Sequence, residues 1–478
     1  MRKKILYLLS ACFFVTLTGI FSDIHLGDEI LHFRLARTIF HSGFWPLFDP
    51  LNQSFDNQKL FYIDPMLWHT FLAFIWKLFF GVSKITAQIY QTAYLAVLVI
   101  SVYIFSKKLY NDRTAVFTAL LLITTPGILL LSVIFHTDMP AIALAALAVA
   151  LISRENFLWA GIITGLCFLT KRTSLIFIPG FLVFLIYFLK GSLREKFFKS
   201  ISFLLPAAIF CYLGQKHYSA VLGLLNSSIN NSALLMHCPD INFYLKDMFD
   251  LKNNLLVLPA FLGISTIASF CLYLFCRAFS KKDLVLWTAL GSFLMVYFIF
   301  FTKNISLRYS MILVPLLCLI AAKGIATLKS KIFRRVIIII SIIQFFSTLG
   351  FILIQRRVTK QERDVYTYIK SNTKPDSRFM CTRPDLQLYT GRKTIWNNYL
   401  SLKELPCLFW SANDAQIKII LDKYGIDYLL VEKDRIYNDS LQKHQLGWPK
   451  SFVGKIPGIN CFELEFENNR ISLWKIKK

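Results

Sequence analysis

Motifs for nucleotides and structural metals are missing from this 478-residue sequence. It has no P-loop, no dinucleotide fingerprint, and no cysteine and histidine cluster at zinc-binding spacing. An obvious internal repeat and a low-complexity linker are missing too. These absences argue against a nucleotide-dependent enzyme and against a zinc-binding module, and we expect no metal and no cofactor.

Acidic residues are also scarce. The chain has 28 Asp and Glu against 53 Lys and Arg, which gives a net charge of +25. In a soluble protein this balance would suggest a nucleic-acid partner. Here the basic residues fit loops on the cytoplasmic side, where they face anionic lipid, so we expect a bilayer partner and no nucleic acid.

Apolar residues are abundant instead. They make up 55% of the chain, and the mean hydropathy is +0.53. Several runs approach the roughly 20 residues that span a hydrocarbon core: Ile5–Phe21, Leu255–Phe275, Leu284–Phe301 and Val336–Ile354. The composition therefore predicts an α-helical polytopic membrane protein.

Basic flanks predict the topology. The N-terminal "MRKK" places the first residues in the cytoplasm, so the residues that follow the first span are predicted to lie on the outer face. The basic stretches 190–199, 276–282 and 323–335 are predicted to be cytoplasmic. The spans that satisfy these positions are 139–152, 157–170, 174–189, 200–215, 255–275, 284–301, 306–325 and 336–355.

The number of spans between residues 65 and 137 has two solutions. It must be even, yet there are three apolar runs, at 66–80, 85–106 and 114–135. Either one run does not cross, or the last is a broken pair split at Thr124-Thr125-Pro126-Gly127. The total is then 11 or 13 transmembrane helices, and we favour 13.

Two domains are predicted. Residues 1–357 form the transmembrane domain, with outer loops at 22–64 and 216–254, the first holding re-entrant or amphipathic helices. Residues 358–478 are richer in charge and form a small extracytoplasmic α/β domain. Its predicted helices and strands are 363–372 and 413–425, then 427–433, 461–467 and 471–477. Cysteines in the polar regions could pair if these are exported: Cys238, Cys381, Cys407 and Cys461.

Charged residues gather at span ends on the predicted outer face. Such residues are costly at membrane depth, so they are candidates for function. A cationic group there can hold a lipid phosphate, and a carboxylate can take a proton from an acceptor hydroxyl. The candidates are Asp28, Glu29, Asp138, Lys171, Arg172, Arg308 and Tyr309.

Structural roles remain open for several of these residues. Asp28 and Glu29 suit a helix start, Lys171 and Arg308 could be interfacial anchors, and Asp138 could cap the next helix. Histidines at 25, 32, 41 and 69 could suggest a metal, but no matched ligand set is visible.

Five stretches, in order, resemble one family. They are "GDEILHFRLARTIF" (27–40), "YIDPMLWHTFLAFIWKLFFGVS" (62–83), "HTDMPAIALA" (136–145), "GLCFLTKRTSLIFIP" (165–179) and "LRYSMILVPLLCLIAAKGI" (307–325). Together they resemble the polyprenyl-phosphate-sugar-dependent glycosyltransferases of the GT-C fold. The nearest group contains the protein O-mannosyltransferases and the lipid A aminoarabinose transferase.

The resemblance implies an inverting sugar transfer from a polyprenyl-phosphate donor on the outer face of a bacterial cytoplasmic membrane. The acceptor would be a glycolipid, a glycan or a protein. By position, Asp28 would be the general base, and Glu29 its neighbour or an acceptor contact. The donor phosphate or sugar would lie near Lys171, Arg308, Tyr309, Asp138 and Arg34.

One position departs from the aminoarabinose transferases. They place Lys before the Pro of the second span, whereas this chain has Asp64 before Pro65. A carboxylate repels phosphate, so Arg34, Arg37 or Lys59 would have to compensate.

Two other functions fit a polytopic protein. A transporter or flippase for a lipid-linked glycan would often show inverted repeats and midplane charges, whereas these charges gather at one face. A non-catalytic relative could bind a lipid-linked glycan within an assembly.

The acid pair gives a direct test. Asp28→Asn is expected to abolish sugar transfer while the protein still inserts and folds, because the amide cannot accept the proton of the acceptor. Transfer assays on the purified variant, beside its thermal unfolding curve, measure both properties. Turnover at the wild-type rate would refute the assignment of Asp28 as the base.

Overall fold

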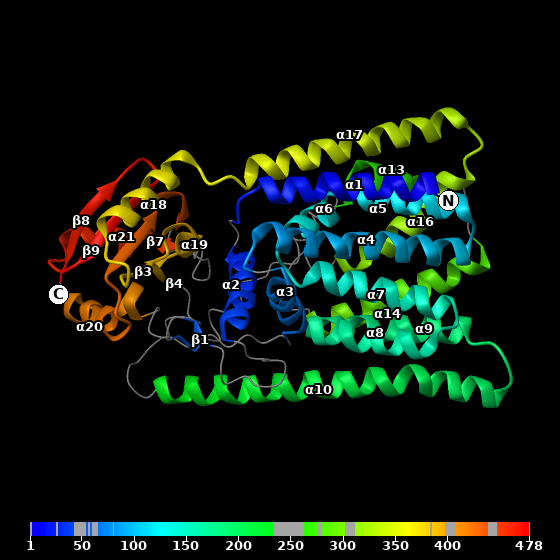
Figure 1. Ribbon diagram of the computed structural model, residues 1–478, viewed down its shortest axis with the longest axis horizontal. Helices are drawn as coiled ribbons and strands as arrows, with labels where there is room; N and C mark the ends of the chain where they lie inside the picture. The colour runs from blue at the N-terminus through cyan, green and yellow to red at the C-terminus, as the bar shows by residue number, and fades with distance from the viewer. Residues whose placement is uncertain are drawn as a thin grey trace.

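The computed structural model shows a helical bundle joined to a C-terminal α/β domain (Figure 1). It describes residues 2–24, 27–42, 54–55, 58–59, 66–79, 81–233, 262–275, 280–301, 311–382, 385–396, 407–437 and 447–477.

Long apolar helices lie side by side along the long axis of the molecule (Figure 1). Each of them overlaps a predicted span or apolar run. They are α1 (Arg2–Phe21), α4 (Lys84–Leu109), α7 (Asp138–Ser153), α8 (Phe157–Thr170), α9 (Ile178–Phe188), α10 (Leu193–Ala233), α13 (Ile264–Phe275), α14 (Lys281–Phe301), α16 (Val314–Thr327) and α17 (Lys331–Gln355).

Two helices run across this axis. α2 (Gly27–Ser42) and α3 (Leu67–Leu78) lie between the bundle and the C-terminal domain, and Figure 1 shows both nearly perpendicular to the long helices. We call this end of the bundle the α2 end. Between α2 and α3, strands β1 (Ser54–Phe55) and β2 (Gln58–Lys59) pair antiparallel, a hairpin that the sequence did not predict.

The run at 114–135 is a bent pair. α5 (Asp112–Thr124) and α6 (Pro126–Val133) meet at 60°. Pro126 causes the break because it has no N–H to donate to the preceding turn. The backbone N–H of Thr125 donates to Leu122 O at 3.3 Å, and the Thr125 hydroxyl donates to Leu121 O at 2.7 Å. Of the three apolar runs in this region, the first forms α3, which lies crosswise (Figure 1), the second forms α4, and the third is this bent pair.

Hydropathy alone identifies fewer candidate spans. Three described helical stretches are long and apolar enough to cross a membrane by themselves, and the bent pair is a fourth. They are Lys84–Leu109, Leu193–Lys216 and Lys331–Asn372. The other long-axis helices are short and apolar, so their length alone does not establish a crossing.

Two elements differ from the prediction. α10 continues as a helix to Ala233, where an outer loop was expected from residue 216. The remainder of that predicted loop, 234–254, lies outside the described residues. The span predicted at 174–189 begins as a 3₁₀ helix, Arg172–Phe177, before α9.

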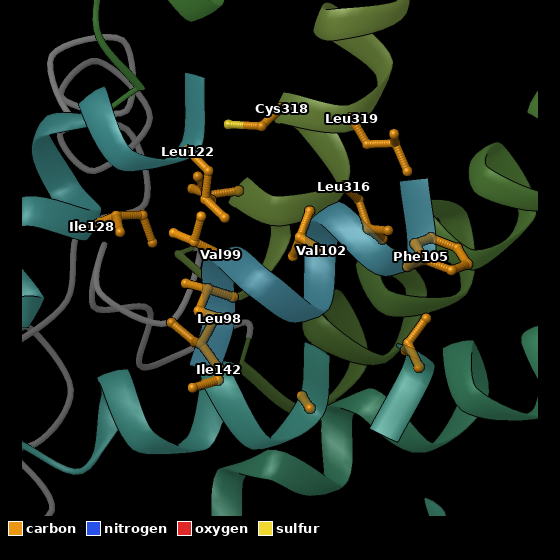
Figure 2. Close-up of a cluster of buried hydrophobic side chains, with 14 of the residues drawn as sticks. Leu98, Val99, Val102, Phe105, Leu122, Ile128, Ile142, Leu316, Cys318 and Leu319 are labelled. Atoms are coloured by element: carbon orange, nitrogen blue, oxygen red, sulfur yellow. The ribbon is translucent and has the colours of Figure 1, made fainter. Parts of the chain in front are cut away.

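The core of the bundle surrounds α4. Figure 2 shows Leu98, Val99, Val102 and Phe105 of α4 among side chains from α5, α6, α7 and α16. All four are at most 4% exposed. This packing fixes the ends of α4 and α7, which carry part of the site described below.

α8 and α10 pack through glycines. Gly161 and Gly165 are four residues apart and so share one face of α8. A Cβ at Gly161 would overlap Phe203 O and Pro206 Cγ, and one at Gly165 would overlap the Phe210 ring. Small residues at this spacing let two apolar helices approach closely.

The C-terminal domain is a mixed sheet with helices on both faces. The strand order is β4-β3-β5-β9-β8, with β3 (Arg378–Cys381) parallel to β4 (Lys393–Trp396) and β5 (Tyr428–Glu432). β9 (Ile471–Ile476) runs antiparallel to β5 and to β8 (Phe462–Glu467). The sequence predicted β5, β8 and β9 but missed β3 and β4.

Alternation along the strands separates two cores. Met380, Leu429 and Val431 join one cluster, whereas Phe379 and Leu430 join the other. This follows from the period of two in a strand. The helices are α18 (Lys360–Asn372), α19 (Asp385–Thr390), α20 (Asp414–Lys423) and α21 (Lys450–Lys455), and the short pair β6 (Ile436–Tyr437) and β7 (Trp448–Pro449) completes the domain.

Glycine packing gives a test of the bundle. Gly161→Ala is expected to lower stability by about 1–3 kcal/mol, because the new Cβ meets the backbone of α10. Gly350→Ala in α17 is the matched control: its Cβ would meet nothing within 4 Å, so the better helix propensity of Ala leaves stability equal or higher. Thermal unfolding in detergent measures both variants. Equal melting temperatures would contradict the predicted close approach.

Candidate active site

Glu29 is fully buried at the α2 end. It lies in the first turn of α2 and is 0% exposed. Its Oε1 accepts a 2.5 Å hydrogen bond from Arg356 Nη2 and a 3.3 Å bond from the backbone N–H of Phe135. A carboxylate so deeply buried needs such a partner to remain charged. Glu29 therefore joins α2, the turn before α7 and the end of α17.

The chain entering α2 is held by the chain leaving α17. The backbone N–H of Asp23 donates to Arg356 O at 2.7 Å, and Arg356 Nη2 donates back to Asp23 O at 3.1 Å. The N–H of Val358 donates to Asp23 Oδ2 at 2.8 Å. Lys84, at the start of α4, donates to Ile20 O at 3.0 Å. The segment between α1 and α2 is thus fixed on two sides.

The C-terminal domain touches the same segment. Tyr389 of α19 donates its hydroxyl to Ile24 O at 3.2 Å. Its ring stacks on Tyr366 of α18, with ring centroids 5.4 Å apart. Burial, with the nearby charge of Asp23, raises the pKa of Tyr389 well above its usual range, so the hydroxyl stays protonated and remains a donor.

Asp138 and Lys171 form a second buried ion pair. Lys171 Nζ bonds Asp138 Oδ1, and both side chains are 5% exposed. Asp138 Oδ2 lies 2.7 Å from His136 Nδ1. The backbone N–H of Asp138 also points at that nitrogen, at 3.2 Å.

Gln91 of α4 holds the turn that carries these groups. Its Nε2 lies within hydrogen-bond distance of Leu131 O, Ile134 O and His136 O, at 3.0, 2.9 and 3.2 Å. Leu131 lies in the last turn of α6, and Ile134 and His136 follow the helix, so these carbonyls are not satisfied within it. The Gln91 amide thereby fixes the backbone of the turn that positions His136 and Asp138.

Three histidines gather beside this turn. His32 Nδ1 and His69 Nε2 share a 2.8 Å hydrogen bond, and the rings of His32 and His136 are 4.5 Å apart between centroids. Burial lowers the pKa of His69 to about 3, and the nearby His136 adds to the effect. His69 is therefore neutral at pH 7, and its ring takes part in hydrogen bonds without carrying a charge.

The structure brings three of the predicted site residues to the α2 end. Glu29, Asp138 and Lys171 come from separate segments, and each is buried in an ion pair. Arg34 is half-buried on α2. The backbone of Asp28 is the second residue of α2, but its side chain is outside the described set, as are Asp64, Arg308 and Tyr309.

Two structural alternatives do not match the observed contacts. Asp138 is the first residue of α7 and pairs with Lys171, while Thr137 occupies the cap position. Lys171 is buried and does not extend towards headgroups. Sequence reasoning missed Arg356, Lys84 and Tyr389. A signal for Arg356 was its place at a span end, where a basic residue is also typical of a simple membrane anchor.

Metal ligation is not visible in the described part of the chain. Among those residues, no group of three or more His, Cys, Asp or Glu side chains could hold a metal ion. His32 and His69 bond each other, and His41 is exposed at the end of α2.

A family of known proteins matches part of the chain. Residues 64–213 match the dolichyl-phosphate-mannose-protein mannosyltransferase family model. That range holds Asp138 and Lys171 but not the acid pair at 28–29. No curated protein sequence matches the chain.

Solved structures match nearly the whole chain. ArnT from Cupriavidus metallidurans, bound to undecaprenyl phosphate, has a TM-score of 0.64 at 14% identity, covering 98% of this chain and 97% of ArnT. The Archaeoglobus fulgidus oligosaccharyltransferase has a TM-score of 0.52 at 14% identity, covering 89% and 67%. The mycobacterial arabinofuranosyltransferase AftD has a TM-score of 0.53 at 13% identity, covering 99% and 40%.

These matches confirm the resemblance read from the sequence. The chain has the GT-C fold of the polyprenyl-phosphate-sugar glycosyltransferases, with a helical bundle and a small C-terminal sheet domain. It spans less than half of AftD. At these identities the structural likeness establishes the fold.

The buried histidine gives a pH test. The pKa of His69 is lowered from 6.5 to about 3 on folding, so between these values the unfolded chain binds more protons. Stability must then fall as the pH is lowered through that window. From pH 6.5 to pH 5 the loss is about 1–2 kcal/mol, measured as the free energy of unfolding in detergent.

His69→Gln is the matched variant, because it keeps a hydrogen-bonding group without the titration. Its unfolding free energy is expected to depend less steeply on pH over the same interval. An unchanged slope in His69→Gln would assign the pH dependence to other groups.

Proposed function

We propose that this chain is an integral-membrane inverting glycosyltransferase. It transfers a hexosyl or pentosyl unit from a polyprenyl-phosphate donor to an acceptor hydroxyl or phosphate. The acceptor belongs to a glycolipid, a glycan or a protein. The reaction takes place on the extracytoplasmic face of a bacterial cytoplasmic membrane.

One observation carries the proposal: the GT-C bundle gathers candidate residues at a single end. Glu29, Asp138 and Lys171 belong to α2, α7 and the residue after α8, and all three are buried at the α2 end. Buried charges at one end of an apolar bundle are expensive and are characteristic of functional sites.

The reaction needs one base and one anion site. The Asp28 carboxylate takes the proton of the acceptor hydroxyl as the acceptor oxygen attacks the anomeric carbon. The bond from that carbon to the phosphate oxygen breaks, and the configuration inverts. The bonding electrons leave with polyprenyl phosphate, whose negative charge is held by Lys171, Arg34 and Arg308.

The remaining residues shape the donor site. Tyr309 supplies a hydroxyl to the phosphate or the sugar, and Asp138 lines the sugar pocket while it holds Lys171. Two relatives support a lipid-phosphate donor: ArnT, bound to undecaprenyl phosphate, and the Archaeoglobus fulgidus oligosaccharyltransferase, in complex with dolichol-phosphate.

The arrangement of the ends supports the assigned side. The N-terminus lies at the end of the bundle opposite the C-terminal domain (Figure 1), which agrees with a cytoplasmic "MRKK" and an exported domain. Cys407 in the C-terminal domain is disulfide-bonded, whereas Cys461 is a free thiol. A disulfide is typical of an oxidising compartment.

The donor can be tested directly. Purified protein in detergent is incubated with radiolabelled polyprenyl-phosphate sugars, with the corresponding nucleotide sugars in parallel, and with membrane extract as acceptor. We expect label transfer from the lipid-linked sugars only, because the chain has no motif that would bind a nucleotide.

Asp28→Asn is the control for catalysis within the same assay. Transfer from nucleotide sugar alone would overturn the donor assignment. Movement of intact lipid-linked sugar across a vesicle bilayer, without transfer and without dependence on Asp28, would favour the transporter instead.

A further inference from the structure

Arg356 has an unusual place between the two domains. It follows the last residue of α17 and is 4% exposed. Its Nη2 bonds Asp23 O and Glu29 Oε1, and its carbonyl accepts from Asp23 N–H. Its ion pair with Glu29 joins the start of α2 to the linker of the C-terminal domain.

We propose that Arg356 is a positioning residue for the acid pair at 28–29, and that it makes the linker to the C-terminal domain part of the active site. Through Glu29, it fixes the depth and rotation of α2 and so the backbone that carries Asp28. The inference rests on the proposed function and adds to it a residue outside all five family-like stretches.

Glu29 is the link between Arg356 and α2. It bonds Arg356 from one side and the Phe135 N–H from the other. A helix carries consecutive residues about 100° apart on a rigid cylinder. Two bonds to Glu29 in the first turn therefore determine how the neighbouring position is presented.

The C-terminal domain reinforces this link. Val358 N–H donates a hydrogen bond to Asp23 Oδ2 at 2.8 Å, and the Tyr389 hydroxyl donates one to Ile24 O at 3.2 Å. Both contacts fall within five residues of Asp28 in the chain. The entry to α2 is thus set by the linker and by α19, and a loosened C-terminal domain would release the acid pair.

A single substitution would mix two effects. Removing one partner of a buried ion pair leaves an uncompensated charge and destabilises the fold, whereas replacing both by apolar residues is often neutral. A double variant therefore separates stability from positioning. We choose Arg356→Met, Glu29→Met and the two combined.

The double variant is expected to melt near the wild-type temperature but to turn over about 100-fold more slowly, because α2 is no longer held in place. The KM for the polyprenyl-phosphate sugar should stay within about twofold, since Arg356 does not touch the donor in this proposal. Amide exchange in the peptide spanning residues 20–33 should also increase.

Asp283 and Lys323 provide the matched control. They form a buried ion pair between α14 and α16 near Tyr110, which follows α4, at the end of the bundle far from α2. Lys323→Met should lower the melting temperature as Arg356→Met does. Turnover per folded molecule and exchange at 20–33 should be unchanged in it.

The outcomes separate the two claims. If the double variant recovers both its melting temperature and its turnover, Arg356 is only structural and the inference fails. If exchange at 20–33 is the same as in the wild type, the inference also fails. If the wild type transfers no sugar from any lipid-linked donor, the proposed function fails, and with it the role of Arg356 in transfer.

Discussion

Pairing of buried charge is the constraint on which this structure depends. An apolar bundle does not readily bury an unpaired charge, because the free-energy cost of removing the ion from water exceeds the stabilisation gained from packing around it. Three buried pairs meet this constraint: Glu29–Arg356, Asp138–Lys171 and Asp283–Lys323. Each joins elements that are distant in the chain, so each also fixes how helix ends meet. The first two lie at the α2 end and the third at the opposite end, beside Tyr110.

Each of the two ion pairs at the α2 end balances its own charge. The carboxylates of Glu29 and Asp138 are offset by Arg356 and Lys171, and the neighbouring His69 is neutral. A balanced, water-poor cluster is rigid, since moving one member exposes its partner. This rigidity is what catalysis by positioning requires, because preorganised groups need no rearrangement as charge develops. Lys171 belongs to one of these pairs, and in the proposed reaction Arg34 and Arg308 add to its charge at the donor phosphate.

The sequence predicted the long helices, but it did not show which charged residues pair with one another. Apolar run lengths and basic flanks located the long helices, and charge at span ends singled out Asp138 and Lys171. Their pairing was not visible, because either residue alone also suits a cap or an anchor. The run at 66–80 was ambiguous since a crosswise helix and a span share the same composition. β3 and β4 were missed because four-residue strands carry little periodicity.

The Glu29–Arg356 bond has a consequence for biosynthesis. Its two residues are separated by 327 positions, and a ribosome adds roughly 5–20 residues each second. Glu29 therefore enters the membrane region many seconds before its partner exists. A chain interrupted anywhere before the final span carries the acid pair without the clamp. Synthesis of α17 and the linker after it, rather than insertion of the first helices, is the step that allows this end of the bundle to assemble.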